Sequence, residues 1–312
     1  MGYTVSSLPA YVEQNRLPLL KAAILKGKTV EVINRQSGVK GKAALNIVDI
    51  TAPFQSGADC GFNASGNDTF TQRTIETALL KVEKSWCWKT LIGKWTEYQM
   101  RNGIEAGEKE LDFEEFFLNT IAEKIAAKIE EIIWQGLTIS GTTLTKGLLA
   151  ELQTASVDPT ANAGSTYYEK VLEAYNAIPE AVLDSAVIFV GAGVFRGLVQ
   201  NLVAANLYHF DPGAPKDELI LPGTDTRVIK VNGLNSATMS VTSGGSTTVY
   251  ENLIVAADPQ NLVYGYDIEG SERDFDVWYE KKDDAILFRM QTNIGSQVAI
   301  PSEVKVYGTP RA

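Results

Sequence analysis

Residues 111–136, "LDFEEFFLNTIAEKIAAKIEEIIWQG", form the clearest single element of the sequence. Asp112 is a good N-cap residue, Glu115 has the spacing of a capping box, and Gly136 is a natural helix end. A helix of about 23 residues, with a rise of about 1.5 Å per residue, would be about 34 Å long. We expect this rod to serve as the spine of a flat domain.

Large apolar residues recur every four positions along this helix. Because a helix turns once in about 3.6 residues, these side chains form a stripe that winds slowly around the helix axis. The stripe predicts that one side of the helix lies in the core. The core residues that we predict here are Phe113, Phe117, Ile121, Ile125 and Ile129.

The residues before the helix predict a long two-stranded ribbon with a loop at its tip. Residues 52–69 are rich in Gly, Asn, Asp and Ser, which is typical of a loop. Residues 70–88 carry apolar side chains in a period of two, which is typical of a strand. Residues 43–90 would together form the ribbon, and such a ribbon is only marginally stable alone in water. It therefore needs a surface to lie on.

The first 42 residues are basic, although the chain as a whole is acidic. Seven Lys and Arg residues stand there against two Glu residues, a local charge of +5, whereas the whole chain carries −10. A solvated helix and turn would explain this charge, and an arm beside a polyanion or an acidic surface is the alternative. We expect a short helix from Pro18 to Lys26, and short strands or an extended arm over residues 27–51. The basic candidates for such contacts are Arg16, Lys21, Lys26 and Lys28.

Helices and strands alternate after Gly136, so the chain as a whole is of the α+β class. The stretch "DSAVIFVG", residues 184–191, predicts a buried strand that is followed by a helix. The stretch "LFRMQTNIGSQVAIPSEVKVYG", residues 287–308, predicts one long strand, a short interruption and a second strand. Its only carboxylate is Glu303, and it has no His or Cys. We therefore expect this terminal ribbon to have an architectural role.

The motifs that could carry chemistry are weak. The stretch "VIFVGAGVFRG", residues 187–197, follows a strand and opens a helix, but its third glycine is one residue late for a dinucleotide fingerprint, so we interpret it as a tight turn. His209 is the only histidine, and no G-x-S-x-G elbow accompanies it. Cys60 and Cys87 match no metal or redox spacing. We predict no catalytic residue, no cofactor and no metal site.

The order of these elements resembles that of the major capsid proteins of tailed bacteriophages, which have the Hong Kong 97 fold. The passages "WQGLTISGTTLTKGLLAEL" after the helix and "VAIPSEVKVYG" near the chain end are both similar to passages of that family. The resemblance implies five parts: an N-terminal arm (1–42), an E-loop with flanking strands (43–100), a peripheral domain with a spine helix (101–149), most of an axial domain (150–265) and the closing strands of the peripheral domain (266–312).

The resemblance implies a structural subunit without enzymatic activity. The subunit would self-assemble as pentamers and hexamers into an icosahedral phage head around double-stranded DNA, which it would contact non-specifically. It would belong to a virion capsid assembled in the host cytoplasm, with portal, scaffolding and cement proteins as further partners. A neighbouring subunit would cover the ribbon, and the residues that we expect at that contact are Cys60, Phe62, Asn63, Phe70, Trp86 and Trp88.

Three other functions stay open from the sequence. An encapsulin-like nanocompartment shell would have the same fold and would enclose a cargo protein instead of a genome. A tail component is an example of another self-assembling structural protein. An α/β enzyme of unrecognised type would use the glycine turn at 191–197 or the pair Asp274 and Asp276. No membrane partner is expected, because no apolar segment of about 18 residues occurs.

Overall fold

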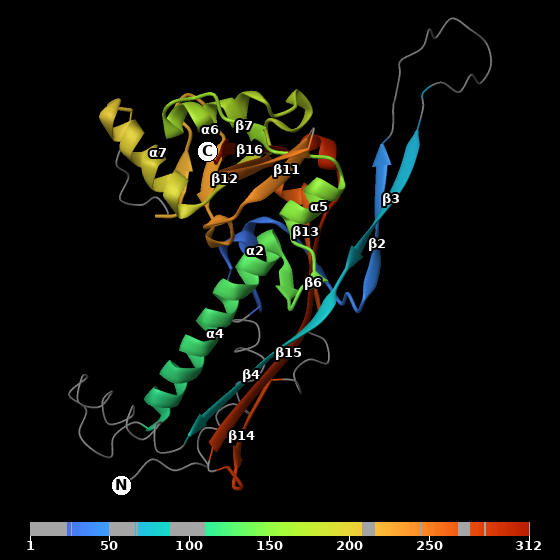
Figure 1. The fold of residues 1–312 in the computed structure, drawn as a ribbon, viewed down its shortest axis with the longest axis vertical. Helices are drawn as coiled ribbons and strands as arrows, with labels where there is room; N and C mark the ends of the chain where they lie inside the picture. Colours follow the sequence, from blue (N-terminus) through green and yellow to red (C-terminus); the bar gives the residue numbers. More distant parts are fainter. Residues whose placement is uncertain are drawn as a thin grey trace, which may run out of the picture.

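The computed structural model describes most of the chain (Figure 1). Figure 1 shows a compact domain at one end, a long helix and a long sheet that extend from it, and a two-stranded ribbon that projects from the side of the molecule. The residues described are 24–25, 27–49, 66, 68–87, 110–207, 216–243, 245–267, 275–283 and 285–311, of which 49, 110–117 and 275 are described by their backbone alone.

A five-stranded sheet is built around the long strand β15 (Ala285–Val298). Strand β4 (Ala78–Cys87) pairs antiparallel with β15 along one side, over ten residue pairs. Along the other side, β15 pairs first with β14 (Phe275–Glu280) and then with β13 (Leu262–Asp267). Strand β13 also pairs in parallel with β1 (Asn34–Ser37). One strand therefore joins residues 78–87 to residues 262–280 and, through β13, to residues 34–37.

A seven-stranded sheet forms the compact domain. Its strands and the helices on its two faces are β7 (Thr160–Ala161), β8 (Val187–Val190), β9 (Glu218–Ile220), β10 (Arg227–Lys230), β11 (Met239–Ser243), β12 (Ser246–Ala257), β16 (Lys305–Pro310), α5 (Leu148–Thr154), α6 (Tyr167–Asn176) and α7 (Ala192–Ala204). The strand order is β7–β16–β12–β8–β10–β9, and β11 pairs with β12. Ile188 and Val190 of β8 pack with α6 and α7, whereas Val187 and Phe189 face the core that includes α5. Such alternation along a strand means that both faces of the sheet are covered.

Helix α4 (Glu110–Gln135) is the long helix that the sequence predicts, but it begins at Glu110, so Asp112 lies within its first turn and is not the N-cap. Ile125 and Ile129 are buried in the main core, and Ile121 is half-buried at its edge. The side chains of Phe113 and Phe117 lie outside the described residues. The helix ends at Gly136, whose φ of +78° favours glycine.

Several shorter elements connect these parts. Helix α2 (Lys28–Val32) lies beside the last turns of α4, and the hairpin of β5 (Leu137–Ile139) and β6 (Thr142–Thr145) follows α4 directly. Strands β2 (Lys42–Asp49) and β3 (Thr69–Glu76) form the projecting ribbon. Four 3₁₀ turns complete the described elements: η1 (Glu180–Val182), η2 (Asn232–Leu234), η3 (Pro259–Asn261) and η5 (Pro301–Glu303).

Two expectations for the first 90 residues are wrong. Residues 28–32 form a helix where we expected strands or an extended arm, because Thr29 and Val30 are fully buried there and packing outweighs their preference for strands. The ribbon is also shorter than residues 43–90, since residues 78–87 leave it and pair with β15. Both segments have the period of a strand, so the sequence pattern alone does not reveal their different partners.

The end of the chain also differs from the expected division. Residues 266–312 were expected to close the domain of the long helix, but β16 lies between β12 and β7 in the seven-stranded sheet. The turn η5 ends the path along β15 and redirects the chain, and Val304 and Val306 are then buried in the main core. Strand β13 differs from the expected division in the opposite direction. Residues 262–265 were expected in the axial domain, but they belong to the five-stranded sheet.

Candidate functional site

The ribbon of β2 and β3 is the first candidate site. Its strands are joined by eight residue pairs. On one face, at the base, Ile75 is fully buried against Val39 and Val263. On the opposite face, near the far end, Val48 pairs with Phe70, and these residues are 51% and 73% exposed. Figure 1 shows that β2 and β3 project away from the rest of the described chain. The exposed apolar pair therefore lies away from the core of its own chain.

Two glycines allow the base of the ribbon to lie directly on the five-stranded sheet. Gly265 and Gly295 are paired with each other in β13 and β15. A Cβ atom on Gly295 would lie 2.1 Å from the carbonyl oxygen of Glu76, and one on Gly265 would lie 2.7 Å from Cδ1 of Ile75. The sequence analysis missed this crossing, although a glycine inside a strand often marks a close approach of another backbone.

Two of the six predicted contact residues, Phe70 and Trp86, lie among the described residues. Phe70 is exposed on the ribbon, as described above. Trp86 is half-buried on β4, where its ring lies 6.3 Å from the ring of Phe288, so it contributes to the core of its own chain. The other four, Cys60, Phe62, Asn63 and Trp88, lie outside the described residues.

A groove of about 520 Å³ separates α4 from the sheet strands β4 and β15. Its walls include Trp86, Ile121 and Ile125, and lysines 84, 124 and 128 also line it. The hydroxyl of Thr292, in the wall formed by β15, has no hydrogen-bond partner among the described residues. The part of the lining that the structure describes holds no carboxylate, thiol or imidazole. The groove can therefore accept apolar groups, but it offers no acid, base or nucleophile of that kind.

Of the four basic arm residues predicted as contact candidates, Lys28 is the one that the structure describes. Its Nζ lies 2.7 Å from Oε1 of Glu218 on β9 and 3.6 Å from Oε2 of Glu31. The hydrogen bond to Glu218 raises the pKa of Lys28 above its ordinary value, although partial burial acts in the other direction. This lysine thus meets an acidic partner within its own chain. Arg16, Lys21 and Lys26 lie outside the described residues.

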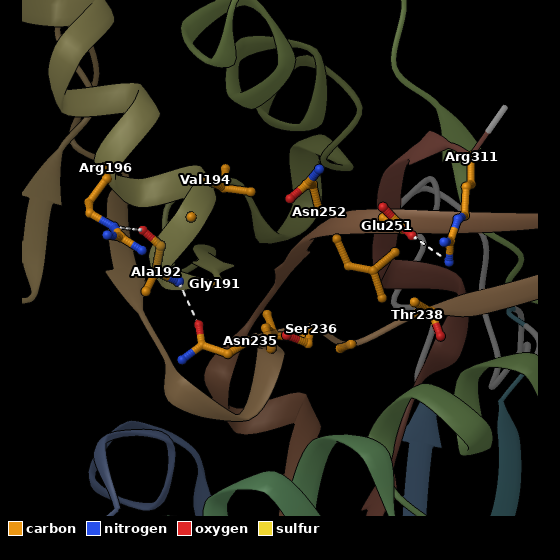
Figure 2. A pocket seen from close by; sticks show the side chains of 14 residues that line it. Gly191, Ala192, Val194, Arg196, Asn235, Ser236, Thr238, Glu251, Asn252 and Arg311 are labelled. Carbon is orange, nitrogen blue, oxygen red and sulfur yellow. Dashed lines mark hydrogen bonds and ion pairs between the residues drawn. The ribbon is translucent and has the colours of Figure 1, made fainter.

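The glycine turn at 191–197 lines a pocket of about 580 Å³ that the start of α7 forms with residues 234–238, β12 and Arg311 (Figure 2). The side chain of Asn235 accepts a hydrogen bond of 2.8 Å from the backbone N–H of Ala192, in the first turn of α7. The nearby Arg311 forms an ion pair of 3.2 Å with Glu251. A Cβ atom on Gly197 would lie 2.2 Å from the ring of Tyr167, so this glycine permits α6 and α7 to pack closely. Close packing of α6 and α7 therefore explains Gly197, and the hydrogen bond and the ion pair explain Asn235 and Arg311, without a bound ligand.

The other described side chains that could act in catalysis or metal binding do not lie together in one site. Among the described residues, no three His, Cys, Asp or Glu side chains lie where they could hold a metal ion. Cys87 is a free, exposed thiol. Asp276 accepts a hydrogen bond from the N–H of Val277, while Asp274 and His209 lie outside the described residues. No helix in the described part of the chain is long and apolar enough to cross a membrane.

Comparisons with known proteins show the fold. No protein-family model and no curated protein sequence matches the chain. Solved structures match it over nearly its full length: a chain of the satellite phage P4 procapsid, which includes the size determination (Sid) protein, has a TM-score of 0.59 and 12% identity, with 94% of this chain and 90% of that chain covered. The capsid of a native GTA particle has a TM-score of 0.56 and 14% identity, with 93% and 91% covered.

A third match is the virus-like particle from Pyrococcus furiosus, with a TM-score of 0.50, 11% identity, and 95% of this chain and 99% of that chain covered. Together these likenesses show that the chain has the Hong Kong 97-type capsid fold. The long helix α4 is the element that the sequence resemblance implies as the spine helix of this fold. At these identities the likeness concerns the fold, so the function needs its own argument.

Proposed function

We propose that this chain is the major capsid protein of a tailed-phage-like particle. In this proposal it is a structural subunit without enzymatic activity that assembles through pentamers and hexamers into an icosahedral head around double-stranded DNA. The particle would be assembled in the host cytoplasm, and the DNA would be contacted non-specifically. Portal, scaffolding and cement proteins would complete the particle. The full-length likeness to capsid subunits supports this proposal.

The observation that carries the proposal is the ribbon. Val48 and Phe70 expose apolar surface near the far end of a two-stranded element that, among the described residues, packs on the core only at its base. An isolated ribbon of this kind is marginally stable, and an exposed apolar pair is stabilised when another surface covers it. A second copy of the chain is the partner that repeats such a contact around a closed shell.

The proposal is tested by electron microscopy of the purified protein beside a variant with Val48→Ser and Phe70→Ser. We expect shells, tubes or capsomers from the unchanged chain. The variant should melt at nearly the same temperature, because these side chains are exposed, but should fail to close regular shells. Thr74→Ser changes another exposed position of the same ribbon and should assemble normally. A strictly monomeric protein at high concentration would exclude the proposed function.

A nanocompartment shell is the second candidate function. The likeness to the virus-like particle from Pyrococcus furiosus favours it, because that match covers as much of the two chains as the phage matches do. The two functions differ in what the particle contains. Nucleic acid in nuclease-treated particles purified from the native source would support the phage head, whereas a single co-purifying protein cargo without nucleic acid would support the nanocompartment.

A further inference from the structure

The short stretch from Lys28 to Ser37, which we call the joint segment, contacts three parts of the molecule. Lys28 forms its ion pair with Glu218, at the edge of the seven-stranded sheet. Thr29 is hydrogen-bonded to Glu130 of α4. Residues 34–37 form β1, which pairs with β13 of the five-stranded sheet. One short segment thus connects the compact domain, the long helix and the long sheet.

The contact with α4 is a buried chain of hydrogen bonds. The backbone N–H and the hydroxyl of Thr29 both donate to Oε1 of Glu130, at 3.1 and 2.9 Å. The same hydroxyl accepts a hydrogen bond of 2.8 Å from Nε1 of Trp134. Thr29 and Trp134 are fully buried and Glu130 is 2% exposed. In such surroundings each lost partner leaves a desolvated polar group, so the arrangement is strongly specified.

The last turn of the long helix contacts the compact domain directly beside this chain of hydrogen bonds. Trp134 packs on Phe189 of β8, with ring centroids 5.4 Å apart. A Cβ atom on Gly233 of η2 would lie only 2.2 Å from Cδ1 of Trp134, so the two parts are in close contact here. Gln135 adds a hydrogen bond of 2.8 Å from Nε2 to the carbonyl oxygen of Gly233. Figure 1 shows that the rest of α4 extends away from the compact domain.

We propose that the joint segment sets the angle between α4 and the compact domain. The hydroxyl of Thr29 holds the last turns of the helix, and the ammonium group of Lys28 holds the edge strand of the domain. Without these two contacts, the helix would be held to the domain by the packing of its last turn against β8, η2 and α5, and this end of the helix can act as a pivot. For a shell subunit the same angle determines how neighbouring subunits meet, a consequence that rests on the proposed function.

The angle can be measured in the full chain with spin labels. Lys128→Cys on α4 and Val203→Cys on α7 place labels at exposed positions, after Cys60 and Cys87 are changed to serine. Labelled protein diluted into an excess of unlabelled protein gives the distance within one chain by double electron–electron resonance. We expect one narrow distance peak for the unchanged joint segment, and the same peak for Thr29→Ser, which keeps the hydroxyl.

Thr29→Val has nearly the same shape but lacks the hydroxyl, and we expect it to lose the single narrow peak. Thr292→Val is the matched control, because it removes a buried hydroxyl outside the joint segment and should leave the peak unchanged. If Thr29→Val does not fold, Lys28→Met decides the test, since its side chain lies near the surface, and it should broaden the peak. An unchanged peak in a folded Thr29→Val variant, or in Lys28→Met, would overturn the proposal. The distance is measured within one chain, so the result is independent of whether shells form.

Discussion

Two buried threonines have opposite surroundings. The hydroxyl of Thr29 donates to Glu130 and accepts from Trp134, whereas the hydroxyl of Thr292 has no partner among the described residues. The hydroxyl of Tyr264 is also buried without a described partner, and burial raises its pKa far above the usual range. A buried polar group without a partner costs about 1–3 kcal/mol, so the same substitution should have opposite effects at the two threonines.

Thr292→Val should therefore stabilise the folded chain. Valine keeps the shape of threonine and removes the unpaired hydroxyl, and we expect the free energy of unfolding to rise by about 1 kcal/mol. Chemical denaturation followed by circular dichroism measures this change. The comparison variant is Thr29→Val, for which we expect a loss of about 2 kcal/mol, because Glu130 and Trp134 each lose a hydrogen bond. A decrease in stability for Thr292→Val would mean that its hydroxyl has a partner.

At the scale of elements, local patterns were predicted well and pairings were not. Helix α4 and its end at Gly136 follow from a spacing and a cap signal within one segment. The partner of β4 could not be predicted, because the period-two pattern of residues 78–87 fits the ribbon as well as the sheet. The path of β16 depends on η5, which turns the chain after β15. In the candidate site, the sequence predicted the ribbon but not its crossing over Gly265 and Gly295. These two glycines are far apart in the sequence and meet only because β13 pairs with β15.

The end of α4 gives a matched pair of glycine substitutions. Gly136 and Gly141 both have positive φ, at +78° and +80°. A Cβ atom on Gly136 would lie 2.7 Å from both the backbone N of Gly147 and the carbonyl oxygen of Thr145, whereas nothing lies within 4 Å of one on Gly141.

Gly141→Ala should cost only the backbone strain, about 1 kcal/mol. Gly136→Ala should cost roughly 3 kcal/mol or more, because the hairpin of β5 and β6 must also move. Thermal or denaturant unfolding of both variants measures the difference. Equal losses would show that crowding at Gly136 is relieved without effect on the fold.

At the scale of the whole molecule, the five-stranded sheet holds both the ribbon and the compact domain. Its central strand β15 supports the ribbon at Gly295 and reaches the core of the compact domain at Val298. The joint segment adds a third link through β1 and α2. The direction in which the ribbon projects is therefore determined by backbone contacts near its base, while its exposed far end is left for another surface to cover.

Gly295→Ala should separate this positional role from folding. The added Cβ atom would lie 2.1 Å from the carbonyl oxygen of Glu76, so the base of the ribbon must shift. We expect a loss of about 1–3 kcal/mol in stability, as for an overpacked site, with the secondary structure retained. If the proposed function is right, a shifted ribbon no longer meets its neighbour in the correct register, and regular shells should give way to irregular or open assemblies.

Circular dichroism melting and negative-stain microscopy of the same preparation measure the two effects of Gly295→Ala. Gly193→Ala in α7 is the control, because nothing lies within 4 Å of a Cβ atom on Gly193, and it should leave assembly unchanged and stability equal or slightly higher. A folded Gly295→Ala variant that still closes shells of the original diameter would show that the ribbon adapts at its far end. In that case the contact with the neighbouring subunit would tolerate changes in the direction of the ribbon. The apolar pair Val48 and Phe70 alone would then account for the role of the ribbon in assembly.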